Sequence, residues 1–325
     1  MLNLTFRVND FQDLWLRIYT VGYPVEGETI LTFICDGDNI LYTSLTDCYT
    51  TTSYNHIKTL LSINGSPHID AFIWTHPDKD HSVGIQTLLE MYDPTHKALI
   101  YLPEGLYTNS SFPVCEEAQS AVLYLKEKYN TGQKYQIIPV SLSEHESRSL
   151  IKISFYENIS DRIIHCKYFF MAPFGGLVWR RVSTDAHTPN DLSIVYSMYF
   201  NGVNFLFCGD LAEQTIQFLD DQYLQNAYFV KIPHHGSGEP KSFVGKLVEM
   251  NVKNAVATTT SFHTTNPKKE ILDNYKTISS EINCTGSSHI SSEEYGCIET
   301  SFNIKNLTNN TTLSGNAYQY YKSPQ

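Results

Sequence analysis

The sequence predicts an α/β protein built as a four-layer αββα sandwich, and three observations lead to this fold class. Short apolar stretches rich in Val, Ile, Phe and Tyr fall into two blocks along the chain. Amphipathic stretches with helical spacing accompany each block. The polar motifs come directly after apolar strands, where loops at strand ends form ligand sites in α/β proteins. Two sheets that pack together, each covered by helices, satisfy this pattern.

The first third of the chain predicts five strands, separated by turn signals such as the Asp-Gly-Asp at 36–38. We expect these strands at Asn3–Val8, Leu14–Thr20, Thr29–Cys35, Asn39–Ser44 and Ile69–Trp74. Apolar residues spaced for one helical face predict helices at Asn55–Ile63, Val83–Met91 and Glu116–Tyr129.

The remaining chain predicts further strands at Ala98–Leu102, Tyr135–Val140, Ile151–Tyr156, Tyr168–Met171, Leu192–Tyr199 and Asn204–Phe207. Helices at Leu211–Gln217 and Ser242–Met250 then alternate with strands at Tyr228–Ile232 and Ala255–Thr258. A last strand, Cys297–Asn303, is expected at a sheet edge. Because no repeat or low-complexity linker divides the chain, we expect one domain over 1–325, with insertions around 103–150 and 172–190.

The composition is that of a globular protein. A chain of 325 residues, 42% hydrophobic and 18% charged, can bury a large core. No apolar run approaches the roughly 18 residues of a membrane helix, and the first residues lack the pattern of a signal peptide. The seven cysteines are scattered, without a CxxC pair, as is typical of reduced packing residues. We therefore expect a cytoplasmic protein that binds no membrane.

The formal net charge of −11 argues against a protein that coats nucleic acid, since such proteins are normally basic. It leaves a phosphodiesterase open, because bound metal ions supply positive charge where a phosphate sits.

The segment 75–81 is the most informative motif in the chain. It places His76, Asp78, Asp80 and His81 within six positions, between an apolar strand and an amphipathic helix. In an extended loop, alternate side chains point the same way, so three of these four can converge on one face. Imidazole and carboxylate ligands suit a divalent transition metal with open positions for water. The alternative is a solvated loop that happens to hold two His and two Asp.

Three further motifs follow apolar strands. Asp210 ends a buried strand as Gly-Asp, which on its own is also a common turn. The adjacent His234 and His235 precede Gly-Ser, an unusual arrangement that could otherwise be a pair of surface histidines. His263 follows another strand and, taken alone, is more often a loop residue than a ligand. His187 is a further candidate that stands equally well as a loop histidine.

Together, the order of these motifs resembles the metallo-β-lactamase superfamily of hydrolases over roughly 69–302. The variant that it resembles most is the soluble domain of ComEC-type competence (DNA-uptake) proteins and their stand-alone relatives. Those proteins carry His-x-Asp-x-Asp-His where most of the superfamily has a second histidine, and Asp78 stands at the differing position. The other matching features are Pro173, Asn190-x-x-Ser193, Gly209-Asp210, the Pro-His-His-Gly-Ser of 233–237, His263 and the closing strand from Gly296.

Two family features are replaced in this chain. The N-terminal Val-Gly-Gln-Gly-Asp turn stands only as Val8–Asp13, without its glycines, and the Ile-Asp-Thr-Gly strand end is replaced by Leu41–Ser44. Both concern the substrate-facing edge and leave the metal motifs intact. Because the ComEC-type pattern has Asn190 where other members have a metal histidine, the resemblance disfavours His187 as a ligand.

The resemblance implies a two-metal hydrolase with zinc or manganese, and with magnesium as a further candidate. The implied ligands are His76, Asp78 and His234 or His235 for one ion, and Asp80, His81 and His263 for the other, with Asp210 bridging. The added carboxylate of Asp78 moves the preference toward manganese or magnesium. Asp80 is expected to orient a metal-bound hydroxide, and His263 or His235 to protonate a leaving group or hold a phosphate.

The expected activity is that of a phosphodiesterase or nuclease on a nucleic acid or nucleotide, because two-metal sites suit displacement at phosphorus. A hydrolase of amides or esters, such as lactams, is one alternative, disfavoured by the aspartate-rich ligand set. A non-catalytic docking module that retains the fold and binds a protein partner is another, disfavoured by the nearly complete metal set. The fold alone does not decide between these substrates.

Overall fold

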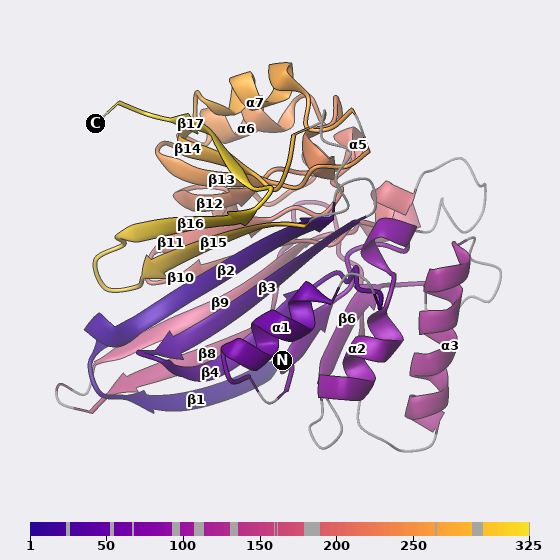
Figure 1. Ribbon diagram of the computed structural model, residues 1–325, viewed down its shortest axis with the longest axis horizontal. Coiled ribbons are helices and arrows are strands. Elements are labelled where there is room, and N and C mark those ends of the chain that lie inside the picture. The colour runs from indigo at the N-terminus through magenta and orange to yellow at the C-terminus, as the bar shows by residue number, and fades with distance from the viewer. Residues whose placement is uncertain are drawn as a thin grey trace.

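The computed structural model describes residues 1–23, 27–52, 55–66, 68–92, 98–106, 114–130, 136–158, 160, 162–178, 189–263, 265–287 and 295–324. It is a mixed α/β structure with two large sheets and few helices (Figure 1). This confirms the α/β class and the two sheets. In these ranges, no helix is both long and apolar enough to cross a membrane.

The first sheet has eight strands, in the order β16-β15-β2-β3-β4-β5-β6-β7. Their bounds are β2 Leu14–Tyr23, β3 Gly27–Asp36, β4 Asn39–Thr46, β5 Ala71–Ile73, β6 Leu99–Pro103, β7 Gln136–Val140, β15 Gly296–Asn303 and β16 Asn309–Gly315. The pairs from β16 to β4 are antiparallel, and those from β4 to β7 are parallel. Loops after β4, β5 and β6 therefore leave at the same end of the sheet.

The second sheet has nine strands, in the order β1-β8-β9-β10-β11-β12-β13-β14-β17. Their bounds are β1 Leu2–Val8, β8 Arg148–Glu157, β9 Ile163–Ala172, β10 Val195–Phe200, β11 Val203–Phe207, β12 Ala227–Lys231, β13 Ala255–Thr259, β14 Ser279–Cys284 and β17 Tyr318–Lys322. Strands β11 to β14 are parallel, so the loops after β11, β12 and β13 also share one end.

Helices pack against both sheets (Figure 1). They are α1 His56–Ile63, α2 Ile85–Tyr92, α3 Glu116–Asn130, α5 Glu213–Ile216, α6 Phe243–Glu249 and α7 Lys269–Tyr275. In α1 and α2 the buried residues recur at i, i+3 and i+4, so one face of each helix meets the sheet: these residues are Ile57, Leu60 and Leu61 in α1, and Ile85, Leu88 and Leu89 in α2.

Three hydrophobic cores follow from this packing. The first joins α1, α2 and α3 to one face of the first sheet, through residues such as Leu61, Leu88, Leu125, Phe33 and Trp74. The second lies between the sheets and includes Ile18, Ile34, Tyr168, Tyr196 and Phe229. The third joins the second sheet to α6 and α7, through Val230, Ile282, Phe243 and Leu272.

The structure corrects several sequence predictions. The strand Cys297–Asn303 is not at an edge, because β15 pairs with β2 on one side and β16 on the other. Strand β16 is not predicted from the sequence, because its Asn-Asn-Thr-Thr-Leu-Ser-Gly sequence is largely exposed and carries no apolar alternation. The strand predicted from Leu192 begins at Val195, because Pro189–Leu192 forms a 3-10 helix.

Candidate metal centre

The predicted ligands converge where loops from both sheets meet. His76, Asp80 and His81 follow β5 of the first sheet, with the last two in the 3-10 helix Lys79–His81. Asp210 follows β11 and His235 follows β12, both in the second sheet. The parallel direction of these strands explains why their polar ends lie together.

Four of these residues form a compact group of imidazoles and carboxylates. One ligand atom from each of Asp80, His81, Asp210 and His235 lies within 4.8 Å of all the others. His81 Nε2 is 3.3 Å from Asp80 Oδ2 and 3.5 Å from Asp210 Oδ1. His235 Nε2 is 3.0 Å from Asp80 Oδ2 and 3.8 Å from Asp210 Oδ2. His76 Nε2 approaches from another side, 3.9 Å from Asp210 Oδ2.

Three atoms of this group are buried and have no hydrogen-bond partner among the described residues. They are Nε2 of His76, Nε2 of His81 and Oδ1 of Asp210. A buried polar atom without a partner costs about 1–3 kcal/mol, so three at one place are not a by-product of packing. Imidazole nitrogens and carboxylate oxygens are the donor set of zinc and related divalent metals. These side chains therefore fit a divalent metal.

Asp47, which directly follows β4, orients two of the histidines. Its carboxylate accepts hydrogen bonds from the backbone N–H and the hydroxyl of Thr75, each at 2.7 Å, and lies 2.7 Å from His81 Nδ1. Because the Thr75 hydroxyl gives its only proton to Asp47, it must accept from His76 Nδ1, 2.9 Å away. Both imidazoles thus carry a proton on Nδ1 and direct Nε2 into the site.

A strained turn delivers His235 to the site. His234, His235 and Gly236 have φ values of 49°, 52° and 68°, in the left-handed region that disfavours residues other than glycine. Two backbone bonds hold the turn: His234 N–H donates to Gly209 O at 3.1 Å, and Lys268 N–H donates to Gly236 O at 2.9 Å. Such strain costs of the order of 1–3 kcal/mol per residue and is typical of functional sites.

The turn that carries Asp210 is fixed by Ser193. The backbone N–H of Asp210 donates to Ser193 Oγ at 2.9 Å, and Gly209 before it has a φ of 48°. A Cβ at Gly209 would lie 2.5 Å from the same hydroxyl oxygen, so only glycine fits there. The serine of the Asn190-x-x-Ser193 motif therefore positions the carboxylate of Asp210.

The carboxylates and imidazoles of the site shift one another's pKa values. Burial of the His81 imidazole opposes its charged form, but Asp80 and Asp210 raise its pKa well above the ordinary value. Burial also favours the neutral form of Asp210, yet the histidines beside it, His235 first, hold its pKa well below the ordinary value. The carboxylates therefore stay ionised while the neighbouring imidazole attracts a proton. A bound metal would take the place of that proton.

The other predicted site residues lie at the rim or outside the group. Asp78 has a side chain 37% exposed, with Oδ2 3.5 Å from His76 Nε2. His234 is 30% exposed, with Nε2 3.8 Å from Asp210 Oδ2 and 3.5 Å from Asn190 Nδ2. His263 is exposed, and its ring packs against Phe262 with centroids 4.0 Å apart, away from these contacts. His187 lies outside the described residues.

Two acids behind the histidines, Asp47 and Glu28, are not among the residues predicted from the sequence. Glu28 lies in β3 and is 1% exposed. Asp47 directly follows an apolar strand, which is the signal that identified Asp210. It was missed because that strand was expected to end at Ser44, whereas β4 continues to Thr46.

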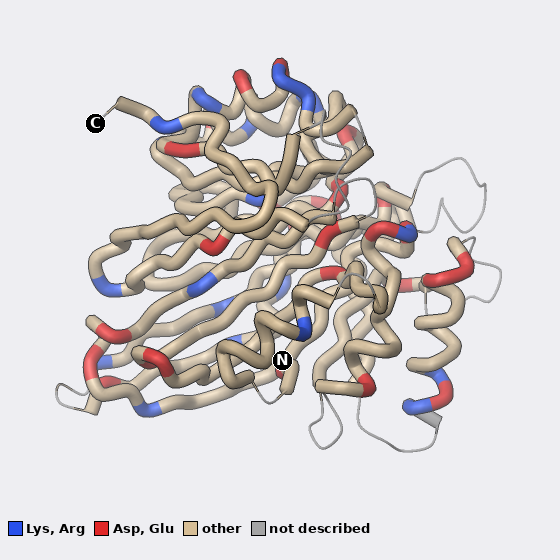
Figure 2. Tube along the Cα trace, viewed as in Figure 1, with Lys and Arg blue, Asp and Glu red and all other residues tan. Residues whose placement is uncertain are grey.

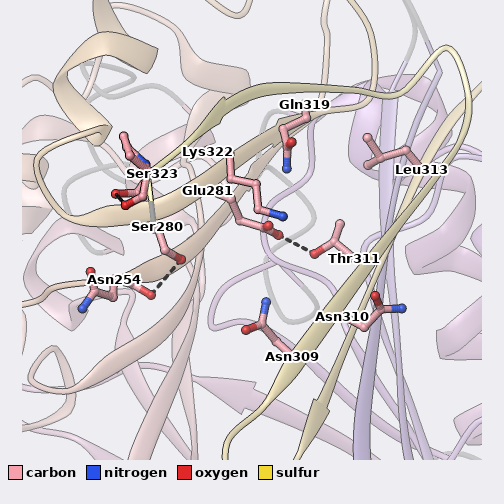
Figure 3. A pocket seen from close by; sticks show the side chains of 11 residues that line it. Asn254, Ser280, Glu281, Asn309, Asn310, Thr311, Leu313, Gln319, Lys322 and Ser323 are labelled. Carbon is pink, nitrogen blue, oxygen red and sulfur yellow. Dashed lines mark hydrogen bonds between the residues drawn. The ribbon is translucent and has the colours of Figure 1, made fainter.

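A separate cavity of about 550 Å³ lies between β14, β16 and β17 (Figure 3). Amides and hydroxyls line it, and Thr311 donates a hydrogen bond to the carboxylate of Glu281. None of the predicted metal ligands lines this cavity, so it is distinct from the candidate metal centre.

Comparison with known proteins gives little. No family model matches the chain, and no curated protein matches it. Among solved structures, the Rm3 metallo-beta-lactamase is similar at 11% identity, over 72% of this chain and 76% of that chain, with a TM-score of 0.28.

Proposed function

We propose that the chain is a metal-dependent hydrolase whose metal centre is formed by His76, Asp80, His81, Asp210 and His235. The observation that carries this proposal is the set of buried, unpartnered atoms: two imidazole nitrogens and a carboxylate oxygen, facing one another at the ends of both sheets. The four-layer αββα order predicted from the sequence agrees with the three hydrophobic cores.

The residue set has enough donors for two divalent ions, with Asp78 and His234 at the rim completing it. Zinc and manganese suit this mixture of nitrogen and oxygen donors, and magnesium is a further candidate. When bound, such ions would supply an acidified water and stabilise negative charge on the substrate.

The protein residues hold the reacting groups. The Asp80 carboxylate, 3.0 Å from His235 Nε2, faces the centre of the group and can orient a water by accepting its hydrogen. His263 makes none of the contacts within the group, but it is exposed beside Phe262, whose ring stacks on that of His235, and we assign it to the leaving group or phosphate of a bound substrate. His235 is instead committed to the centre by its buried contacts.

A phosphodiester is the substrate that we favour, in the form of a nucleotide or a short nucleic acid. The support is the carboxylate of Asp78, because oxygen donors select the harder cations that phosphate oxygens also prefer. The net charge is −11, and Figure 2 shows Lys and Arg interspersed with Asp and Glu along the described chain. A net negative chain with its positive charges dispersed in this way fits a small nucleotide better than a long duplex.

The test measures bound metal in the purified protein and then hydrolysis of a substrate panel with added manganese or zinc. The panel contains bis(p-nitrophenyl) phosphate, single-stranded DNA, RNA, a cyclic dinucleotide and nitrocefin. We expect cleavage of the phosphodiesters. We expect Asp80→Asn to reduce it by about two orders of magnitude or more, because this residue acts at the reacting centre.

Asp70→Asn is the matched control, because Asp70 is a largely buried carboxylate that accepts a hydrogen bond from Thr43 N–H outside the site. Full activity of Asp80→Asn would contradict the mechanism. Cleavage of nitrocefin alone would support the lactam alternative, and a protein that binds no metal would support the docking module.

A further inference from the structure

We infer that the buried pair Lys231–Glu28 is a positioning device that fixes the orientation and the tautomer of His235. The inference deepens the proposed metal centre and rests on it for its functional meaning. The three residues come from different elements: Glu28 from β3 of the first sheet, Lys231 from the end of β12 and His235 from the turn that follows. The pair therefore connects the two sheets directly behind the site.

Lys231 and Glu28 form an ion pair that is closed to solvent. Lys231 is 0% exposed and Glu28 is 1% exposed, and Lys231 Nζ lies 2.8 Å from Glu28 Oε2. Lys231 Nζ also donates to the backbone oxygen of Ile232 at 3.2 Å. Taking two charges out of water costs several kcal/mol for each, so a pair buried this completely is weak evidence for stability. A different role must explain why the charges are there.

The directions of the hydrogen bonds that connect Glu28 to His235 through Thr260 indicate what that role is. An ionised Glu28 can only accept, and the hydroxyl of Thr260 donates its one proton to Glu28 Oε2. That hydroxyl must then accept from His235 Nδ1, which lies 2.8 Å away. A proton of the His235 ring is thereby placed on Nδ1. Nε2 lies 3.0 Å from Asp80 Oδ2, and because an ionised carboxylate only accepts, Nε2 offers its lone pair there only when a metal ion takes the place of a proton. The Lys231 ammonium group keeps Glu28 ionised. Glu28 therefore remains an acceptor, and the hydrogen bonds from His235 to Thr260 and from Thr260 to Glu28 keep their direction.

The ring plane of His235 is fixed as well. Phe262 stacks on it with centroids 4.5 Å apart and planes inclined by 16°. With Nδ1 held by Thr260 and one face held by Phe262, the imidazole has one orientation left. Outer contacts of this kind determine how well a ligand binds metal.

Glu28 could instead be read as a metal ligand, since Glu28, Asp47 and His81 also offer atoms within 4.8 Å of one another. The contacts argue against that reading. Lys231 already supplies a cation 2.8 Å from Glu28, and Asp47 is occupied by Thr75 and His81. This group is therefore a layer of supporting contacts and not a further ion site.

The test compares the full-length wild type with Glu28→Gln, Lys231→Met and the double variant Glu28→Leu/Lys231→Met. Glu157→Gln is the matched control, because Glu157 is a buried carboxylate that pairs with Arg162 away from the site. Metal affinity is measured by competition with a chelator, using zinc alone. The proton on His235 Nδ1 is read in the metal-free protein from the chemical shift of that ring nitrogen, and the tautomer from the same shift in the zinc-bound protein.

The single variants are expected to bind zinc about 10–100-fold more weakly, and His235 to lose its uniform Nδ1–H form. The double variant decides between positioning and mere stability, because an apolar pair of similar volume restores folding without restoring the acceptor. We expect it to unfold near the wild-type temperature and still bind zinc weakly. If a single variant does not fold, the double variant still gives the answer.

Zinc affinity and a His235 tautomer equal to those of the wild type in the double variant would overturn the inference. That result leaves the metal centre itself standing. A wild-type protein that binds no metal would instead overturn the proposed function, while the tautomer measurement would still report on the positioning of His235.

Discussion

At the scale of single residues, three imidazoles enter the site in the same orientation, with Nδ1 turned away from the site and Nε2 turned into it. Nδ1 of His76, His81 and His235 lies 2.7–2.9 Å from an oxygen of Thr75, Asp47 and Thr260, respectively. Each Nε2 consequently points into the site from the opposite side of its ring, and those of His76 and His81 have no hydrogen-bond partner among the described residues. Side chains arranged in this way before metal arrives lose little conformational freedom when it binds.

The raised pKa of His81 predicts how metal affinity depends on pH. In the metal-free protein Asp80 and Asp210 favour the protonated imidazole, and metal must displace that proton. Affinity is therefore expected to keep rising as the pH is raised through and beyond the range over which an ordinary histidine titrates. Chelator competition at a series of pH values measures this, with proton release followed in weak buffer. An affinity independent of pH over this range would contradict the assignment of His81 as a ligand.

Some of these residues can be predicted from the sequence and others cannot, for a physical reason. His76 and His81 stand close together in one polar loop, so spacing alone marks them. Glu28 of the first sheet acts on His235 of the second. Thr260, which forms hydrogen bonds with both, directly follows β13. Contacts that depend on how two sheets pack leave no local pattern in the chain.

At the scale of elements, the paired strands β2 and β15 lie in very close contact with the segment that follows β14. Gly22 and Gly296 are paired in the ladder, and Thr285 of the segment after β14 lies against both. A Cβ at Gly296 would stand 1.6 Å from the backbone oxygen of Thr285, where no side chain can yield. The two sheets can approach this closely only because neither Gly22 nor Gly296 carries a side chain.

Two glycine substitutions, one at this contact and one in open space, are expected to change the free energy of unfolding in opposite directions. Gly296→Ala is expected to lower the free energy of unfolding by about 1–3 kcal/mol or more, because the added methyl group forces the backbones apart. Gly245→Ala is expected to raise it by up to about 1 kcal/mol, since Gly245 lies in α6 with open space around it. Urea denaturation of both variants measures this. Equal stability of Gly296→Ala and the wild type would contradict the close contact.

Element boundaries could be predicted where burial follows a simple period. Strands such as β3, buried along nearly its whole length, are plain from their apolar sequence. The apolar pattern does not reveal β14, because its residues at 279, 281 and 283 are polar although buried; Glu281, for example, accepts hydrogen bonds from Thr311 and Asn283. Burial of polar side chains depends on their partners, which a periodic pattern does not reveal.

At the scale of the whole molecule, the candidate metal centre belongs to both sheets at once. His76, Asp80 and His81 come from the first sheet, and Asp210 and His235 from the second. A metal bound here would act as a crosslink between the layers. The α/β class and the polar strand ends could be predicted from the sequence, whereas the sharing of the site between sheets required the strand order.

A metal that binds only the folded state must raise its stability. At a free concentration about 100 times its dissociation constant, the expected gain is about 2.7 kcal/mol. Thermal unfolding should therefore shift upward with added zinc or manganese and downward with chelator. Asp210→Asn should lose most of the shift, because it removes a charge that faces both sheets' histidines. A shift that this variant retains in full would place the bound metal elsewhere.

The pairing of β15 with β2 also has a consequence for how the chain is synthesised. One long edge of β2 has no partner until residues 296–303 have left the ribosome. An uncovered edge strand is a template for association with other chains, and long-range pairing of this kind is slow to form. Chains that stop short of β15 are therefore expected to aggregate during expression, whereas the polar and exposed β16 protects the completed sheet at that side.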